Sequence, residues 1–163
     1  MMMPGHAMDE QEQYLFYTSC LAAARGRTVT VRTFDFGADR TMADAYQGVQ
    51  SSKLGLRGIR SSLRNLPQMA VQICALMRAA TKGPLRVMFP MVTDIEDWDS
   101  AMQVVDHCRR KLTERGVEFE PDVPFGVMLS VPAACLTAED FTVHGCRFFV
   151  IGTNDLTLSL IHI

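Results

Sequence analysis

The chain has 163 residues, of which 48% are hydrophobic, and it carries a formal net charge of −2 at neutral pH. A chain of this length and apolar content can bury a sizeable core within one domain. The small net charge offers no basic footprint for nucleic acid, and no apolar run is long enough to span a bilayer. The five cysteines are scattered and include no Cys-X-X-Cys pair, which argues against a disulfide framework or a zinc site. We therefore expect a cytoplasmic protein that binds no nucleic acid and does not insert into a membrane.

The first half of the chain carries alternating helix and strand signals. Residues 1–8 contain neither a basic leader nor an apolar run, and we predict that they form a disordered leader. A helix is predicted from Asp9 to Ala24, followed by a strand rich in β-branched residues from Thr28 to Asp35. The glycine-punctuated segment Leu54–Arg60 is typical of a short strand or turn. A second helix, with a proline near its start, is predicted from Asn65 to about Ala80.

The second half repeats the alternation. Strands are predicted at Leu85–Met91, Phe125–Val131 and Phe148–Thr153, and the last of these is apolar enough to be buried on both faces. A long helix is predicted to begin at a capping box between Thr93 and Glu96, and a short helix to run from 133 to 140. This alternation indicates βαβ units around a parallel sheet. A closed (β/α)₈ barrel needs about 250 residues, so the roughly five predicted strands form either a small open α/β sheet or part of a barrel.

Polar side chains follow several of the predicted strands. Arginine presents a rigid fork of donors that matches phosphate or carboxylate, and aspartate can hold Mg²⁺ beside substrate oxygens. Together these side chains suit a site for a small phosphorylated acid. The alternative is that the arginines are solvated surface charges and that the asparagine and aspartate only cap a helix. The side chains are Arg32 and Asp35, Arg57 and Arg60, and Asn154 and Asp155.

Four segments agree in order and spacing with motifs of one enzyme family. Residues 148–157 (FFVIGTNDLT) match FFSIGTNDLTQ, residues 31–40 match RTLDIGGDK, residues 54–60 match LGxRxIR, and residues 85–92 match LRIMFPMI. On these segments the chain resembles the phosphoenolpyruvate-utilising enzymes, above all enzyme I of the bacterial sugar phosphotransferase system. The resemblance implies an α/β fold that is a partial (β/α)₈ TIM barrel, with roughly its first five strands. Residues 9–163 would then form an incomplete phosphoenolpyruvate-binding barrel domain.

The resemblance also implies a site. Arg32 and Arg57 match arginines that bind the phosphate of phosphoenolpyruvate, and Arg60 stands close by as a helper. Asn154 matches a residue that contacts the bound phosphate, and Asp155 matches a ligand of Mg²⁺. In the family, the phosphoryl group passes from phosphoenolpyruvate to a protein histidine, so the resemblance implies a domain of a phosphotransferase.

Three departures from the family pattern weaken the catalytic part of this reading. Ser130 stands where the family has its second metal carboxylate, and a neutral hydroxyl is a poor substitute for a charged ligand of Mg²⁺. Cys74 replaces a family arginine, and the chain ends before the cysteine with which the family protonates the enolate. We therefore assign no catalytic residue and expect the isolated chain to be inactive.

Two alternatives to the phosphotransferase reading stay open. The chain is then either a non-catalytic module that binds a small phosphorylated acid or another subunit, or an incomplete gene product. If the chain is a partial barrel, its two unpaired sheet edges predict self-association.

Overall fold

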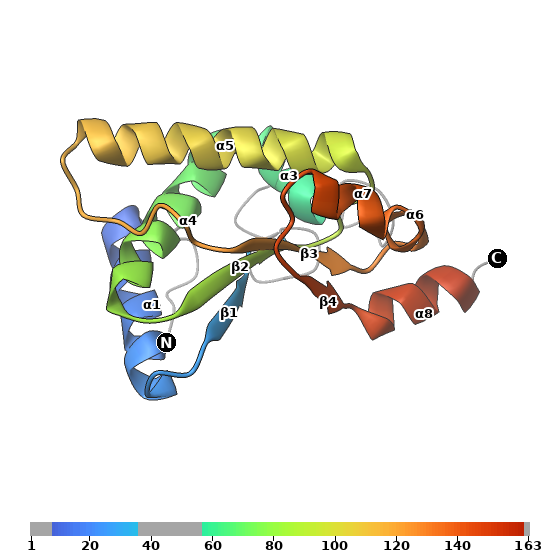
Figure 1. Cartoon of the computed structure of the whole chain (residues 1–163), viewed down its shortest axis with the longest axis horizontal. Coiled ribbons are helices and arrows are strands. Elements are labelled where there is room, and N and C mark those ends of the chain that lie inside the picture. The colour runs from blue at the N-terminus through green and yellow to red at the C-terminus, as the bar shows by residue number, and fades with distance from the viewer. Residues whose placement is uncertain (1–7, 36–56, 162–163) are drawn as a thin grey trace.

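The computed structural model describes residues 8–35 and 57–161, with side chains through residue 158 (Figure 1). The predicted disordered leader, except for Met8, and the segment 36–56 lie outside the described residues. The elements in chain order are α1 (Glu10–Ala24), β1 (Val29–Arg32), α3 (Gly58–Arg64), α4 (Leu66–Ala79), the 3₁₀ turn η1 (Ala80–Lys82), β2 (Leu85–Phe89), α5 (Ile95–Glu114), β3 (Phe125–Leu129), α6 (Pro132–Leu136), α7 (Ala138–Val143), β4 (Phe149–Ile151) and α8 (Thr153–Ile161).

The four described strands form one parallel sheet in the order β1-β2-β3-β4. The register aligns Arg32 of β1 with Met88 of β2, and Met88 with Gly126 of β3. Because all strands run in the same direction, their carboxyl ends meet at one edge of the sheet, which is where α/β barrels place their functional groups. The sheet therefore supports the predicted α/β fold and is consistent with part of a barrel.

Two of the predicted strands differ from the structure. The sequence predicts a short strand or turn at 54–60, of which 54–56 lie outside the described residues; α3 begins at Gly58, and the described residues contain four strands. The strand at 148–153 is predicted to be buried on both faces, yet β4 is a terminal strand of the described sheet and its Ile151 is 66% exposed. The start of α3 has a non-local cause, because the Gly58 backbone donates to the carboxylate of Asp35.

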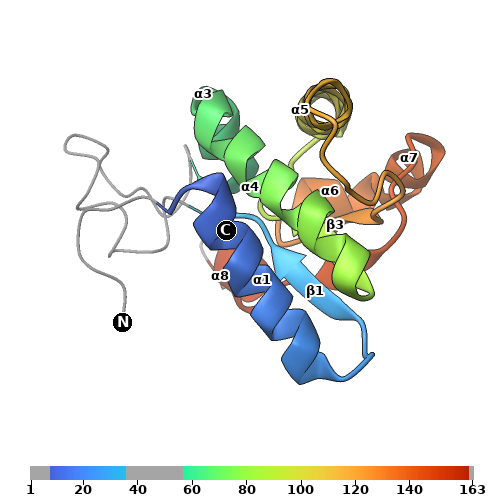
Figure 2. The same ribbon diagram turned by 90° about the vertical axis from the view of Figure 1, so that its left-hand side faces the viewer.

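Helices α4 and α5 cover one face of the sheet, and α1 packs beside α4 (Figures 1 and 2). On the covered face, Val87 and Phe89 of β2 are fully buried. Phe89 stacks on Phe125 of β3 at 5.6 Å and meets the edge of Trp98 of α5 at 6.0 Å, measured between ring centroids. Offset and edge-to-face aromatic contacts of this kind add to the stabilisation from burial. They fix α5 over the middle of the sheet.

The long helix α5 begins at a cap one residue later than predicted. Its N-cap is Asp94, whose carboxylate accepts a hydrogen bond from the backbone of Asp97 at 2.9 Å, and the predicted pair Thr93 and Glu96 does not form the capping box. An aspartate accepts such bonds at least as well as threonine does.

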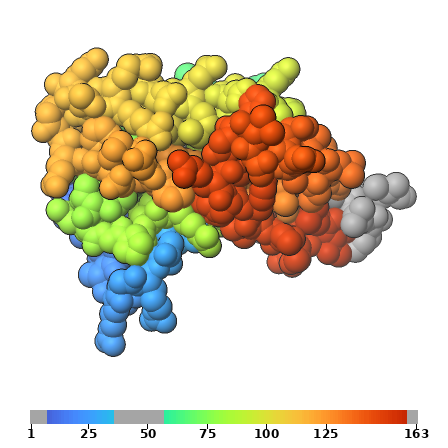
Figure 3. All heavy atoms as spheres, in the orientation of Figure 1, coloured from blue at the N-terminus to red at the C-terminus, as the bar shows by residue number. Residues whose placement is uncertain are grey.

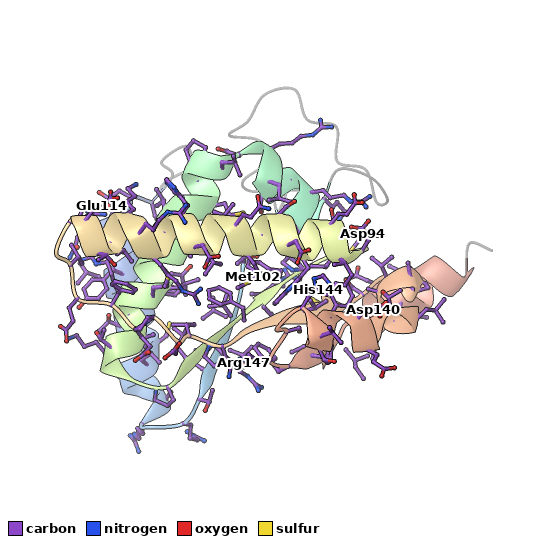
Figure 4. The ribbon with its side chains drawn as sticks, turned by 45° about the horizontal axis from the view of Figure 1, so that its top comes forward. Asp94, Met102, Glu114, Asp140, His144 and Arg147 are labelled. Atoms are coloured by element: carbon purple, nitrogen blue, oxygen red, sulfur yellow. The ribbon has the colours of Figure 1, made fainter. Side chains whose placement is uncertain are left out.

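Helix α5 is also tied to the end of α7. The indole nitrogen of Trp98 donates to the His144 carbonyl at 3.0 Å, and the His144 ring lies 3.0 Å from Asp99. Figure 4 shows His144 beside the first half of α5, whose ends are marked by Asp94 and Glu114. In the space-filling view of Figure 3, the atoms of α7 pack against those of α5. These contacts hold the segment that leads into β4.

Candidate functional site at the carboxyl edge of the sheet

A buried ion pair lies at the carboxyl edge of the sheet. The guanidinium of Arg57 donates to the carboxylate of Asp35 at 2.9 Å, and the two side chains are 14% and 1% exposed. On its other side, the same guanidinium lies 4.0 Å from the carboxylate of Asp155, in the first turn of α8. Arg57 therefore links the segment after β1 with the segment after β4, which are the two terminal strands of the sheet.

The backbone before Asp35 is held by hydrogen bonds to side chains of α3 and α4, and a side chain of α1 supports one of them. Gln72 of α4 accepts a hydrogen bond from the Phe34 backbone at 3.1 Å, and its amide nitrogen donates to the Tyr17 hydroxyl of α1 at 2.9 Å. The hydroxyl of Ser62 in α3 donates to the Phe34 carbonyl at 3.3 Å. Gln72 and Ser62 are buried, and a buried polar group that is fully paired fixes its neighbours in one arrangement. The position of Asp35 is thereby set by α1, α3 and α4 together.

Close packing continues around the edge of the sheet. Gly58 approaches the turn after β2 so closely that an added Cβ would meet the Met91 Cβ at 2.6 Å. The Ser130 hydroxyl at the end of β3 donates to the Met91 sulfur at 3.4 Å. A Cβ on Gly152, at the end of β4, would lie 3.0 Å from the Ser130 Cβ. A chain of contacts therefore runs along the carboxyl edge of the sheet, from Gly58 through Met91 and Ser130 to Gly152. Arg57 precedes the first of these residues, and Asp155 follows the last.

The charges at this edge keep Arg57 protonated. Burial alone would lower the pKa of its guanidinium, but the hydrogen bond and charge of Asp35, together with the charge of Asp155, outweigh burial, and the pKa is raised. Arg57 is therefore a permanent cation held between two carboxylates. Its contact with Asp155, at 4.0 Å, is longer than its hydrogen bond of 2.9 Å to Asp35.

Two other predicted site residues lie nearby. Arg32 ends β1 and is exposed, on the same face of the strand as Thr30, which accepts a hydrogen bond from Arg86 at 2.7 Å. This face is opposite to the one that α4 and α5 cover. Asn154 is exposed in the first turn of α8. Neither Arg32 nor Asn154 makes a hydrogen bond or ion pair to the Asp35–Arg57–Asp155 group within the described part of the chain.

Arg60, predicted as a helper, is turned away from this group. Its guanidinium contacts Asp94 and Asp97 at the start of α5, at 3.1 Å from each carboxylate. Its surroundings therefore assign it to holding α3 against α5. Sequence reasoning named Asp35 among the polar side chains that follow strands but did not pair it with Arg57. It missed Met91, whose sulfur accepts a hydrogen bond from Ser130. Asp35 carried a signal, because it follows a strand, but nothing in the sequence connects it with Arg57.

The described residues do not by themselves form a complete Mg²⁺ site. Among residues 8–35 and 57–158 no group of three or more His, Cys, Asp or Glu side chains is placed to hold a metal ion. Ser130 is fully buried, and its hydroxyl is directed to Met91 and to the Met128 carbonyl. Among the described residues, Asp155 is the carboxylate that lies beside the ion pair of Arg57 and Asp35. Proteins usually hold Mg²⁺ through one or two carboxylates together with substrate phosphates, and Asp155 offers one carboxylate of that kind.

A parallel α/β sheet with an arginine and carboxylates gathered at its carboxyl edge has the arrangement in which α/β barrels place their functional groups. Comparison with known proteins gives the particular family. Residues 1–162 match the family described as PEP-utilising enzyme, PEP-binding domain, and the chain belongs to this family. The resemblance found from the four sequence motifs is confirmed.

Similar proteins include phosphoenolpyruvate-protein phosphotransferases from several bacteria. The protein from Cupriavidus necator is 36% identical over 157 residues, which are 94% of this chain. Those from Enterococcus faecalis and Listeria monocytogenes are 36% and 34% identical over 90% of the chain. In each case the match spans 26% of the relative's length, so the chain corresponds to about a quarter of these enzymes. None of the described helices is both long and apolar enough to cross a membrane.

Proposed function

We propose that this chain binds phosphoenolpyruvate at the carboxyl edge of its sheet, as the phosphoenolpyruvate-binding domain of an enzyme I-like phosphotransferase. The observation that carries the proposal is the Arg57 guanidinium, which Asp35 holds 4.0 Å from Asp155 at the edge where such domains bind their ligands. Family membership supports the identity of the ligand. In the complete enzyme, the phosphoryl group would pass from phosphoenolpyruvate to a protein histidine.

Phosphoenolpyruvate carries a phosphate and a carboxylate, and both need cationic partners. Arg57 would bind the phosphate through the guanidinium nitrogen that now faces Asp155, while Asp35 keeps the other nitrogen. Arg32, exposed at the end of β1, would supply a second cation, and Asn154 would donate from its side-chain amide. The N-terminal end of α8 carries partial positive charge, which also favours an anion there.

Asp155 opposes an anionic ligand unless its charge is compensated. In the described structure that compensation comes from Arg57, which the phosphate would take over. We propose Asp155 as a ligand of Mg²⁺, as its family position implies, but the neutral and buried Ser130 leaves it without a second carboxylate. Binding by this chain should therefore depend on the arginines more than on metal.

Ser130 also favours a second candidate function, a non-catalytic module that binds a small phosphorylated acid. A site that keeps its arginines and lacks one metal carboxylate retains affinity for the phosphate and loses the charge that stabilises its transfer. We also propose a cytoplasmic location, supported by the five free cysteines, which are typical of a reducing compartment.

Restoring the missing carboxylate tests the site. Calorimetry with phosphoenolpyruvate, with and without Mg²⁺, would compare the unaltered chain with Ser130→Glu and with the neutral Ser130→Gln, which matches Glu in size. We expect the unaltered chain to bind weakly with little response to Mg²⁺, and Ser130→Glu alone to gain a clear dependence on Mg²⁺, because its carboxylate and Asp155 would contact one ion from adjacent strand tips.

The site of Ser130 is fully buried, so both variants are first checked for a native circular dichroism spectrum. Equal responses of folded Ser130→Glu and Ser130→Gln to Mg²⁺ would mean that positions 130 and 155 do not converge on one ion. Failure of the unaltered chain to bind phosphoenolpyruvate at millimolar concentration, with or without Mg²⁺, would refute the proposed function itself.

A further inference from the structure

Two cysteines meet between the helices that cover the sheet. Cys74 lies on α4 and Cys108 on α5, both are fully buried, and the two helices pack side by side (Figure 2). The Cys108 thiol donates to the Ala70 carbonyl at 3.6 Å. In an α-helix that carbonyl also accepts from the backbone four residues on, which here is Cys74. The contact therefore places the Cys108 sulfur at the turn of α4 that carries Cys74, and the two thiols hydrogen-bond each other.

This arrangement brings the backbones of α4 and α5 close together. A single methylene separates a cysteine sulfur from its Cα, so a Cys108 sulfur in contact with a carbonyl of α4 holds α5 near that helix. The small side chain of Ala70 permits the approach. A disulfide needs sulfurs that face each other and Cα atoms about 4.4–6.8 Å apart. Cys74 and Cys108 are free thiols that already face each other.

The two thiols differ in acidity. The hydrogen bond with Cys108 lowers the pKa of the Cys74 thiol. Burial and the charge of Glu10 oppose this effect, whereas the charges of Lys111 and Arg115 support it. The same hydrogen bond, together with burial, raises the pKa of the Cys108 thiol. Because the thiolate is the reacting species, Cys74 is the better nucleophile of the two.

We propose that Cys74 and Cys108 form an oxidisable dithiol, which hydrogen peroxide converts to a disulfide between α4 and α5. The Cys74 thiolate attacks one oxygen of the peroxide, the O–O bond breaks, and the departing hydroxide takes up a proton to give water. The Cys108 sulfur then attacks the sulfur of the Cys74 sulfenic acid, and the hydroxyl group leaves with the Cys108 proton as a second water. Two thiols lose two electrons, and one peroxide becomes two waters. This inference does not depend on the proposed function.

A groove beside the pair gives the oxidant a route. Its volume is about 770 Å³, and it is lined mainly by residues of α4 and α5. Ala70 lines it one turn before Cys74. Val104 and Lys111 line it one turn before and one turn after Cys108. A small oxidant in this groove therefore needs only a local opening of the two helices to reach the sulfurs.

The alternative is that both cysteines are inert core residues, as buried free cysteines commonly are. Cys146 is a control for this alternative within the same chain. It is also buried, its thiol donates to the Phe148 carbonyl at 3.2 Å, and burial raises its pKa. Cys74 differs from it because a second thiol lowers its pKa.

The test uses the full chain with its two least buried cysteines removed by Cys20→Ser and Cys135→Ser. The folded protein is treated with hydrogen peroxide, the remaining thiols are alkylated, and tryptic peptides are analysed by mass spectrometry. The unaltered chain is treated in parallel. The three remaining cysteines lie on separate tryptic peptides, which span residues 65–78, 87–109 and 116–147.

We expect the peptides of Cys74 and Cys108 to be joined, with a mass that is lower than their sum by the two hydrogens lost. These two thiols should be consumed about tenfold faster than that of Cys146, because reactivity follows the thiolate fraction. No joined peptides, joined peptides that form only in urea, or consumption at the same rate as Cys146 would each overturn the inference.

Two single substitutions in the same background test the order of the steps, after each variant is checked for a native circular dichroism spectrum. With Cys108→Ser, oxidation of Cys74 should stop at the sulfenic acid, which dimedone labels. With Cys74→Ser, Cys108 should take up little dimedone, because it is the less acidic thiol. Equal or reversed labelling would overturn the role of Cys74 as the attacking thiol. Should a serine variant not fold, the joined peptides of the parent chain still decide whether the pair forms.

Discussion

Replacing Gly126 with alanine should weaken the pairing of β4 with β3. An alanine Cβ at this position would lie inside contact distance of the Phe148 carbonyl oxygen and 2.8 Å from two carbons of the Phe148 ring. A side-chain neighbour could rotate away, but a backbone carbonyl cannot. That carbonyl accepts a hydrogen bond from the Val127 backbone at 3.1 Å, which is one of the bonds that join the two strands.

The expected cost combines two effects. Forcing a methyl group into a packed site costs about 1–3 kcal/mol, and weakening one buried backbone hydrogen bond costs about 1 kcal/mol. The lower conformational entropy of unfolded alanine returns about 0.5–1 kcal/mol. We therefore expect Gly126→Ala to lower the free energy of unfolding by about 1–3.5 kcal/mol, which for a chain of this size lowers the melting temperature by about 2–14 °C.

Urea denaturation and thermal melts followed by circular dichroism would measure this effect. Gly83→Ala is the matched control, because Gly83 has an extended backbone with φ of 167° and its added Cβ would meet Leu21 at an ordinary 3.5 Å. We expect the control to lie within about 0.5 kcal/mol of the unaltered chain. Since β4 leads into α8 and Asp155, Gly126→Ala should also weaken phosphoenolpyruvate binding. Equal stability of the two alanine variants would show that β3 and β4 are not paired in the described register.

Two further predictions concern stability and association. Glu10 pairs with Arg78 at 2.7 Å and with Arg115 at 2.8 Å, and although burial raises its pKa, these arginines outweigh burial and lower it. Because the folded pKa lies below the unfolded value near 4.5, the stabilisation is present above that pH and lost as the pH falls through the lower folded value. At pH 7, Glu10→Gln should therefore be less stable than the unaltered chain, by under about 1 kcal/mol for a partly exposed pair, and near pH 2 the two should be equally stable. Urea denaturation midpoints at both pH values would check this. A difference in stability that is the same at both pH values would contradict it. Ile151 is 66% exposed on the terminal strand β4, so Ile151→Lys should reduce self-association measured by light scattering. The control Leu136→Lys, at an 89% exposed position on α6, should leave self-association unchanged. If Leu136→Lys reduced self-association and Ile151→Lys did not, β4 would be excluded as the contact between chains.

Local patterns in the sequence predicted most of the elements. The signal at 148–157 gave a strand followed by polar residues, and the structure has β4 followed directly by α8. The sequence left open whether Asp155 only belongs to a helix start or also takes part in a charged group. In the structure it lies in the first turn of α8 and also faces Arg57. Periodicity and turn residues identify such elements because they depend on neighbours within one or two turns of the chain.

The segment 54–60 shows where local patterns fail. Its alternating apolar residues and glycines favour a strand or turn, yet α3 begins at Gly58 with its first N–H accepted by Asp35, 23 residues earlier. A helix start that depends on a carboxylate from another segment leaves no signature in its own sequence. The same holds for Arg60, which the sequence places beside Arg57 and the structure pairs with Asp94 and Asp97. Long-range pairing decided both cases.

The ion pair between Arg57 and Asp155 depends on the curvature of the whole sheet. In a flat sheet, β1 and β4 would be three spacings apart, about 14 Å at roughly 4.8 Å per strand. The Arg57 guanidinium nevertheless contacts both Asp35, which follows β1, at 2.9 Å and Asp155, which follows β4, at 4.0 Å. Because parallel sheets coil as their strands twist, the carboxyl ends converge as strands are added. The residues of this site are therefore brought together by four strands and the helices that hold them. A change that weakens the pairing of β3 and β4, such as Gly126→Ala, should impair binding although it alters no charged group.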